Sequence, residues 1–239
     1  MIVFIITVIV SAFLQSNIGF GFPIVVMTIF PLLFEYSTAV TLCQIIAFAS
    51  TCYLSVKYYK NIQWKILFPL LGISLIVGAI VTYYSIQVSQ EYLHILLGLM
   101  LCLLALYFFF FSDKIKIKAN IKTATIMGFI AGLGNGLFSI GGPAVVLYLL
   151  PAVKDKKSYL ATIQAYFLIS NVSTVIIRVS KGAIAEDSIS YILIGWVCIL
   201  IGTLLGNYTF KKINDKLLSK LVYLFVLISG LSILAENLF

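Results

Sequence analysis

Acidic, histidine and cysteine side chains are scarce in this sequence of 239 residues. It contains eight Asp and Glu residues, one His and four Cys. The acidic residues all stand at the ends of apolar stretches or between them, and the cysteines stand singly, with no Cys-x-x-Cys pair. Membrane proton relays, metal sites and most catalytic sites are built from clusters of such groups. We therefore expect no metal, no cofactor and no enzyme active site.

Long apolar stretches make up most of what the chain does contain. Hydrophobic residues account for 62% of it and charged residues for 10%, and the mean hydropathy is +1.13. Several stretches approach the roughly 20 residues that a spanning helix needs, which predicts an all-α polytopic membrane protein. The net charge of +8 comes mainly from lysines clustered between these stretches. Such clusters orient a chain in the bilayer, so we expect membrane lipid as its surroundings and no nucleic acid as a partner.

Glycine and proline interrupt two of the apolar stretches. Residues 132–143 read Gly-Leu-Gly-Asn-Gly-Leu-Phe-Ser-Ile-Gly-Gly-Pro, and residues 17–23 read Asn-Ile-Gly-Phe-Gly-Phe-Pro. Glycine is costly to order in a helix and proline lacks an amide hydrogen, so we predict that the helix breaks across each segment. In a bilayer, broken backbone persists only where protein shields it or where it lines a wet cavity. Each break is therefore a candidate substrate site, although glycines also serve close helix packing.

The two broken stretches belong to an internal repeat. An offset of 120 residues aligns Gly21 with Gly141, Pro23 with Pro143, Pro31 with Pro151, Gln44 with Gln164, and Ser50 with Ser170. Spans are predicted at 36–57, 65–86 and 92–111, and again at 158–178, 188–209 and 217–237. Internal repeats of this kind mark the binding interface in many transporters. The predicted division is a first membrane repeat at 1–111, a basic cytoplasmic linker at 112–122 and a second membrane repeat at 123–239.

The charge distribution indicates how each broken stretch lies in the membrane. The half-helix after each break is about 18 Å long or less, too short for a hydrocarbon core of about 30 Å. Each stretch is then either one kinked crossing or a re-entrant hairpin. Hairpins place fourteen of the 16 Lys and Arg residues on one side, whereas kinked crossings divide them nine to seven. The positive-inside rule favours two inverted-topology repeats, each a re-entrant hairpin plus three transmembrane helices, in the cytoplasmic membrane with both termini outside.

Polar residues at membrane depth gather near the two breaks. Half-helices that begin after the breaks point free amides and a partial positive charge at a common place, which suits a small anion. Gln44 and Thr51 are seven residues apart, as are Gln164 and Asn171, so each pair shares one helix face. Such side chains either line a pore or tie helices together. The candidate substrate-binding residues are Asn17, Gly21, Gln44, Thr51, Asn135, Ser139, Gly141, Gly142, Gln164 and Asn171.

The sequence also supports predictions about three residues outside the breaks. Arg178 ends its predicted helix near the outer face, where it either anchors the helix by snorkelling or attracts anions. His94 stands in the first turn of a span and is expected to be a helix-end residue. Gly98 lies in an unbroken span, so we expect it to tolerate alanine.

The segment from Gly132 to Pro143, followed by Pro151, resembles the glycine-rich segment of the sulfite exporter TauE/SafE family of membrane transporters. The resemblance covers nearly the whole chain, and residues 19–31 form a weaker copy of the same segment. That copy departs from the family pattern, because Phe20 and Phe22 stand where glycines are common. The resemblance implies transport of sulfite, sulfonates, sulfoacetate or related organic anions.

These observations favour a secondary transporter that moves a small anion and holds it at the midplane between the two broken helices. An anion channel has the same sequence features, and a non-transporting membrane scaffold or assembly factor is the alternative from another class. The sequence leaves open which anion is carried, the direction of transport, the coupling ion and the oligomeric state.

Overall fold

The computed structural model describes residues 1–18, 20–110, 119–185, 188–209 and 215–238, without the side chains at 17, 18, 207, 209, 215–222 and 238. This part of the chain is helical and holds no strand. The elements in order are α1 (Ile2–Ile18), α2 (Phe22–Val26), α3 (Phe30–Leu33), α4 (Tyr36–Lys57), a 3-10 turn (Tyr59–Asn61), α5 (Trp64–Ser85), α6 (Gln90–Phe110), α7 (Ile121–Phe138), α8 (Gly142–Ala152), α9 (Lys156–Ser180), α10 (Ser188–Thr209) and α11 (Asp215–Leu238).

Each of the six predicted spans coincides with a long helix to within two residues at either end. Within the described residues, α4, α5, α6, α7, α9 and α10 are long and apolar enough to cross a membrane. The all-α polytopic architecture predicted from composition is therefore confirmed. Helix α7 was not among the predicted spans. It is long enough to cross because it extends over 18 residues, or about 27 Å, and so continues past Gly132.

Side-chain caps define where α7 and α9 begin, after the lysine-rich loops. Asn120 and Thr123 form a capping box at the start of α7. At the start of α9, the Asp155 carboxylate accepts hydrogen bonds from the amides of Lys157 at 3.1 Å and Ser158 at 2.9 Å. Hydrogen bonds from the side chain and amide of Ser158 hold the pKa of Asp155 below its usual range. These caps satisfy amides that have no partner within their own helix.

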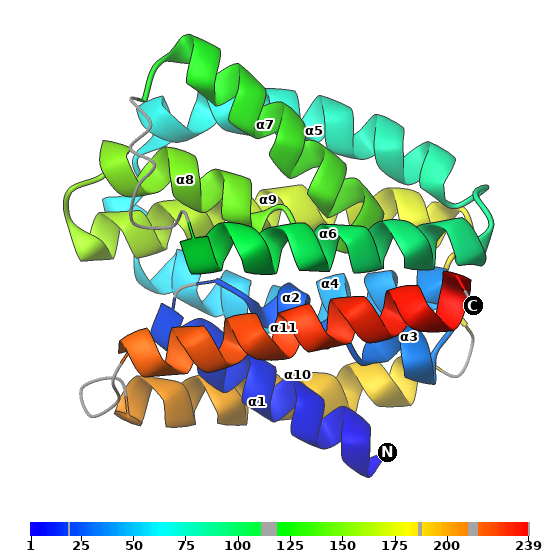
Figure 1. The fold of residues 1–239 in the computed structure, drawn as a ribbon. Helices are drawn as coiled ribbons and strands as arrows, with labels where there is room; N and C mark the ends of the chain where they lie inside the picture. Colours follow the sequence, from blue (N-terminus) through cyan, green and yellow to red (C-terminus); the bar gives the residue numbers. More distant parts are fainter. Residues whose placement is uncertain (19, 111–118, 186–187, 210–214, 239) are drawn as a thin grey trace.

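The second broken stretch is a hairpin. Figure 1 shows α7 starting at the left-hand end of the bundle, and α8 returning to that same end, where α9 begins. With 11 residues, α8 is only about 16 Å long. In the first stretch, α1 starts at the right-hand end of Figure 1, and α2 and α3 lead back toward it. Both stretches thus form the hairpins that the lysine distribution favoured.

The half-helix predicted after Pro23 is itself divided, which the sequence analysis did not anticipate. Helix α2 has five residues and α3 has four, with a turn between them. Pro31 stands in the first turn of α3, where its missing amide hydrogen cannot continue the helix before it. The Thr28 hydroxyl donates to the carbonyl of Val25 at 2.7 Å and so competes with the helical pattern.

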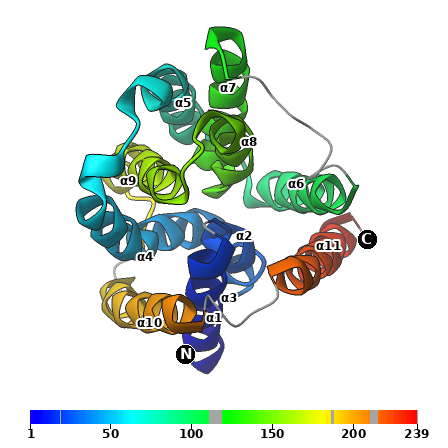
Figure 2. The same ribbon diagram turned by 90° about the vertical axis from the view of Figure 1, so that its left-hand side faces the viewer.

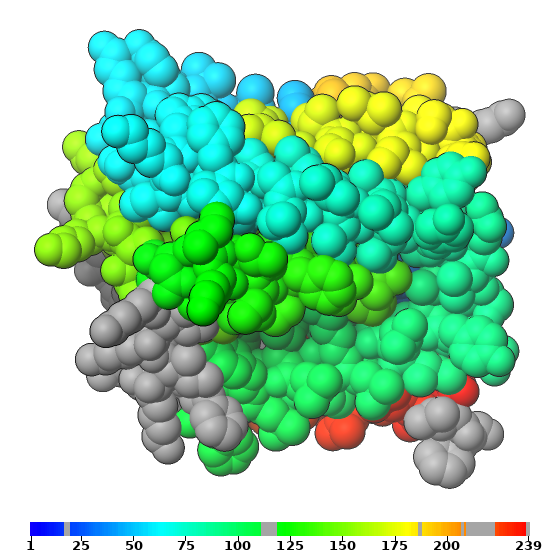
Figure 3. Space-filling model, turned by 90° about the horizontal axis from the view of Figure 1, so that it is seen from above, coloured from blue at the N-terminus to red at the C-terminus, as the bar shows by residue number. Residues whose placement is uncertain are grey.

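The break predicted within residues 132–143 is present, but it is confined to residues 139–141, because α7 continues through Gly132, Gly134 and Gly136 to Phe138. Gly128, Gly132 and Gly136 lie four residues apart and face α5. A Cβ at Gly132 would stand 2.8 Å from the Ser74 carbonyl oxygen, and the other two glycines approach α5 backbone as closely. Close backbone packing of this kind is a common use of small residues in membrane helices. Figure 3 shows α7 lying along α5 on this face of the molecule.

The two halves of the chain interlock. Helix α7 packs on α5 of the other half, and α1 packs on α10, while α4 pairs with α9 and α6 with α11. These are the contacts expected of repeats related by an approximate two-fold axis, because exchanging the halves maps the set of pairs onto itself. Viewed along the bundle in Figure 2, α4 and α9 lie centrally, with the α5–α7 pair at one edge and the α1–α10 pair at the other. The central pair carries four of the ten candidate site residues: Gln44, Thr51, Gln164 and Asn171.

The expectation that Gly98 tolerates alanine is wrong. A Cβ there would stand 2.8 Å from Cγ of Leu234 and 3.0 Å from the carbonyl oxygen of Gly230, both in α11. Gly98 and Gly230 therefore form a close crossing of α6 and α11. Gly72 in α5 has no neighbouring atom within 4 Å of such a Cβ and is the position where alanine fits freely.

Candidate functional site

The second break spans only Ser139 to Gly141. Ser139 ends α7 in the left-handed conformation, with a φ of 63°, and its amide donates to the carbonyl of Asn135 at 3.0 Å. The Ile140 amide donates to the carbonyl of Gly134 at 2.9 Å, which closes the end of α7. Helix α8 then starts with a proline in its first turn, and its N-cap, Gly141, offers no side-chain cap. The first amides of α8 consequently face the break without a partner from their own helix.

The two breaks lie against each other. A Cβ built on Gly142 would stand 3.8 Å from Cβ of Phe20, in the first break, and 3.2 Å from the ring of Phe167 in α9. Gly21 follows Phe20 with a φ of 116°, a left-handed value that favours glycine. The start of α8 thus lies beside the ring of Phe167 and the Cβ of Phe20, one residue from each half of the chain.

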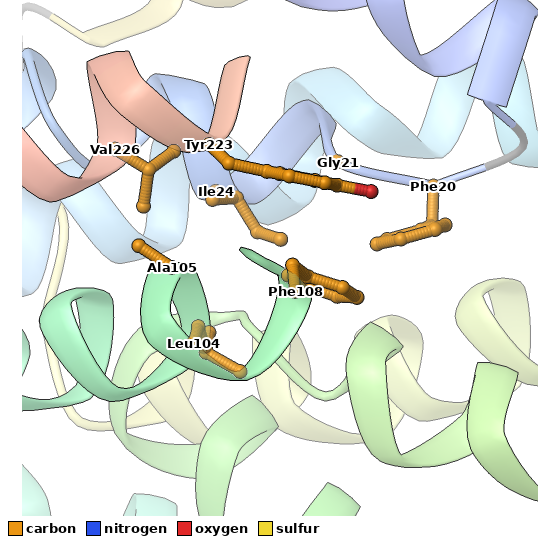
Figure 4. A pocket seen from close by; sticks show the side chains of 8 residues that line it. All are labelled: Phe20, Gly21, Ile24, Leu104, Ala105, Phe108, Tyr223 and Val226. Carbon is orange, nitrogen blue, oxygen red and sulfur yellow. The ribbon is translucent and has the colours of Figure 1, made fainter. Parts of the chain in front are cut away.

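The first break lies in apolar surroundings. Figure 4 shows the side chains from α2, α6 and α11 that close around Gly21. They enclose a cavity of about 20 Å³ lined by Phe20, Gly21, Ile24, Leu104, Ala105, Phe108, Tyr223 and Val226. The rings of Phe108 and Tyr223 stack with centroids 4.9 Å apart. This break therefore brings hydrophobic cover to the site, and the polar groups come from elsewhere.

Those polar groups gather beside the second break. Gln44 and Asn135 are 0% and 1% exposed, and Gln44 Nε2 donates to the backbone carbonyl of Asn135 at 3.4 Å. The Asn135 side chain donates in turn to the Ser170 hydroxyl at 2.8 Å. The side-chain oxygens of Gln44, Asn135 and Asn171 are buried and accept no hydrogen bond from the described residues. Buried acceptors of this kind usually bind water, an ion or a ligand that carries a proton.

A tyrosine that the sequence analysis did not select also borders the second break. The Tyr166 hydroxyl would stand 3.2 Å from a Cβ on Gly141, and it shares a 2.6 Å hydrogen bond with the Ser74 hydroxyl. Tyr166 and Ser170 lie one helical turn apart on α9, so both reach the break from one face. These two side chains were not chosen as site residues from the sequence, because buried tyrosine and serine are also common packing residues in membrane spans.

The end of α7 is held by side chains from three other helices. Arg178 Nη2 donates to the carbonyl of Gly136 at 2.6 Å, and Thr82 Oγ1 approaches the same oxygen at 3.5 Å. The Tyr36 hydroxyl donates to the carbonyl of Leu137 at 3.2 Å. The final carbonyls of a helix have no partner within it, and in a membrane such groups must be satisfied by protein. These contacts satisfy the last carbonyls of α7 inside the bundle.

The expectation that Arg178 snorkels to the outer surface is therefore wrong, whereas its attraction of anions stays a prediction. Its side chain is 1% exposed and turns inward to cap α7. It continues the seven-residue spacing of Gln164 and Asn171 on α9, and that spacing was the signal in the sequence. His94 stands near the start of α6 with its ring edge-on to Tyr36, at 5.2 Å between centroids.

Five of the predicted site residues come together at the second break: Gln44, Asn135, Ser139, Gly141 and Gly142. Gly21 lies close to the second break, because Cβ of the preceding residue, Phe20, stands 3.8 Å from a Cβ built on Gly142.

The remaining predicted residues lie along α4 and α9, or outside the described side chains. Asn171 and Gln164 are buried on α9. Thr51 is buried on α4, and its hydroxyl donates to carbonyls of its own helix at Ala47 and Phe48. The side chain of Asn17 lies outside the described residues.

The described residues contain no cluster of His, Cys, Asp and Glu that could bind a metal ion. The site instead combines amide donors at the start of α8 with side-chain carbonyl oxygens, in the middle of a bundle of membrane-length helices. Broken helices that meet within such a bundle are a feature of membrane transporters.

Comparison with protein families identifies the group to which the chain belongs. Residues 3–233 match the sulfite exporter TauE/SafE family. The chain is therefore a member of this family of membrane transporters, as the resemblance in the glycine-rich segment indicated. The chain matches no curated protein and no solved structure.

Proposed function

We propose that the protein is a secondary transporter that moves a small sulfur-containing or organic anion, such as sulfite, a sulfonate or sulfoacetate, across the cytoplasmic membrane. The anion is held at the second break, against the first turn of α8. The observation that carries this proposal is the uncapped start of α8, which lies beside the buried, unpartnered side-chain oxygens of Gln44 and Asn135.

The start of α8 supplies the positive side of the proposed site. A helix end carries about half an elementary charge, and the amides of its first turn point outward along the axis. Gly142 has no side chain between its backbone and the break, so an anion can approach the amides closely. A site that relies on partial charges and amides should hold one negative charge better than two.

The side-chain oxygens beside the break supply the other half of the recognition. The nitrogen of Gln44 is already engaged by the backbone of Asn135, and its oxygen is left to accept a hydrogen bond. An anion that carries a proton, such as bisulfite, can donate to these oxygens while its charge faces α8. An alkyl sulfonate meets the same oxygens through bridging water.

Phe20 and Phe167 are proposed to control access to the site. The ring of Phe167 and the Cβ of Phe20 approach Gly142 from the two halves of the chain. Displacing the Phe167 ring opens the amides, and returning it excludes water, which strengthens the electrostatic interactions within. In a secondary transporter the two repeats move against each other around a fixed site, and a site bordered by residues from both repeats suits such a motion.

Transport by purified protein in liposomes tests this function directly. Radiolabelled sulfite, methanesulfonate and sulfoacetate should each be offered over a range of concentrations. A carrier gives saturable uptake that is accelerated by the same anion inside the vesicles. A channel gives flux that neither saturates in this range nor responds to internal substrate, and a scaffold or assembly factor gives no flux above that of empty vesicles.

A further inference from the structure

A polar cavity, which we call the end cavity, lies at the end of the bundle opposite the lysine-rich loops. Its volume is about 450 Å³, within the range of small-molecule sites. It is enclosed by residues at the start of α4, between α5 and α6, and after α9, which meet at the right-hand end of Figure 1. Its polar lining residues are Glu35, Ser37, Thr38, Ser85, Ser89, Gln90 and Lys181.

The start of α4 contributes an uncapped helix end to this cavity. The N-cap residue, Glu35, makes no side-chain cap, and α4 is a long helix of 22 residues. The Tyr36 amide donates to Oε1 of Gln90 at 3.3 Å. The amides of Ser37 and Thr38 follow in the same first turn, where a helix leaves amides without internal partners. About half a positive charge therefore faces the end cavity from α4.

A buried arginine stands behind the same residues. Arg178 Nη1 lies 3.5 Å from the hydroxyl of Ser37, a residue that lines the cavity. Nε of Arg178 is buried and has no partner among the described residues, and the partners of its other nitrogens, Ser37 and Gly136, are neutral. The end of α7 offsets only about half of the guanidinium charge. Arg178 does not itself line the end cavity, so its remaining charge acts on the cavity from behind Ser37.

Two charged side chains at the cavity act in opposite directions. The Lys181 ammonium lies 4.3 Å from the centroid of the Tyr83 ring and adds positive charge at the rim. Glu35 adds one negative charge at the end of α4. The sum over α4, Arg178, Lys181 and Glu35 is positive. Acidic residues 186 and 187 lie outside the described part of the chain.

We propose that the end cavity is a second anion site, which binds a small oxyanion through the first turn of α4, the Ser37 hydroxyl and the charges of Arg178 and Lys181. Its role as a station for the transported anion rests on the proposed function. Its ability to bind an oxyanion does not.

The register of α4 and α9 connects the end cavity to the break. Ser37 contacts Arg178, and the antiparallel register that this contact sets places Gln44 level with Asn171 and Thr51 level with Gln164, at seven-residue steps of about 10 Å. The first pair is at the end cavity, and the side-chain oxygens of the second pair are both buried and unpartnered, that of Gln44 beside the break. A polar line therefore runs from one proposed site to the other.

The test measures binding of inorganic sulfate and sulfite to purified protein by calorimetry, in a Gly142→Val background that blocks the central site. Lys181→Gln should weaken the remaining binding by about threefold to tenfold, because a partly screened charge is removed. Glu35→Gln should strengthen it by about two- to fivefold for the same reason. Ser37→Ala should weaken it, and Gly72→Ala, on the far side of α5, should leave it unchanged.

The opposite signs separate an anion site from a structural role. If Glu35→Gln and Lys181→Gln both leave the binding of sulfate and sulfite unchanged, or change it in the same direction, the end cavity is not an anion site. Absence of any binding in the Gly142→Val protein, with its fold shown intact by its melting temperature, also overturns the proposal. Transport by the wild-type protein in liposomes is measured separately. A result that rules out anion binding in the end cavity therefore does not affect the proposed central site, and the reverse also holds.

Discussion

Nη2 of Arg178 donates a 2.6 Å hydrogen bond to the carbonyl oxygen of Gly136, and this contact joins α9 to the last turn of α7. A helix that stops at membrane depth exposes carbonyls that lipid cannot satisfy. The arginine supplies a donor and a charge of the sign that a helix C-terminus favours. The contact therefore supports the end of α7 and, with it, the start of the break.

The first prediction concerns this cap. Arg178→Gln should lower the free energy of unfolding by about 1–3 kcal/mol, because the buried carbonyl of Gly136 loses its closest donor. Arg178→Lys keeps the charge and should cost less. Thermal unfolding of the purified variants in detergent measures both, with Ser180→Ala as the control at an exposed position of the same helix. A Gln variant as stable as the parent protein would show that α7 ends without help from Arg178.

The spans were predictable because apolar length is a local property. Residues 36–57 and 188–209 coincide with α4 and α10, since any run of this length and composition satisfies its backbone only as a helix in a bilayer. The hairpins were predictable because lysine positions carry information on sidedness. The symmetric pairing of α4 with α9 follows from the repeat.

The position of the second break was not predictable to the residue. Gly132 and Gly136 weaken an isolated helix, and only their contact with Ser74 and Gly78 of α5 reveals why they are there. That contact joins residues far apart in sequence, so local propensity gave the wrong boundary. The inward turn of Arg178 was missed for a similar reason, since its partner Gly136 is identified by the fold.

The second prediction separates the glycine at the break from glycines in packing. Gly142→Val should weaken anion binding at the break by at least about tenfold, because its side chain covers the first turn of α8 and meets the ring of Phe167. Gly98→Ala should instead destabilise the fold by about 1–3 kcal/mol through its clash with α11. Gly72→Ala is the matched control, with neither effect. Calorimetric titration and thermal unfolding distinguish the three, and a Gly142 variant that keeps every binding component of the parent protein would place the anion elsewhere.

A third prediction addresses Gln44. In Gln44→Leu the break loses both the donor to the Asn135 backbone and an acceptor for the bound anion. The free energy of anion binding should become less favourable by about 1–3 kcal/mol. Gln44→Glu keeps the shape but adds a negative charge, and should be the worse of the two for an anion. If the Glu variant takes up substrate as well as the parent protein in liposomes, Gln44 does not face the anion.

The fourth prediction is topological. In a background without cysteines, single cysteines at Lys60, Lys122 and Lys156 should be shielded from an impermeant thiol reagent in intact cells, and one at Gln87 should react. The first three lie at the lysine-rich end of the bundle and Gln87 lies at the other. Lysine-rich loops face the cytoplasm under the positive-inside rule. Labelling at Lys156 but not at Lys122 would contradict the hairpin formed by α7 and α8.

The last prediction concerns the charge of the carried anion. The break offers about half a charge from α8 together with the unpartnered oxygens of Gln44 and Asn135, so a second negative charge meets repulsion and finds no donor. Uptake of sulfite at a fixed total concentration should fall as the pH rises and bisulfite loses its proton. Uptake of methanesulfonate, which stays singly charged, should not change over the same range, and it serves as the internal control for the protein. Equal competition by sulfate and methanesulfonate against labelled substrate would show that the site also accepts a dianion, with a cation bound beside it as the remaining source of balancing charge.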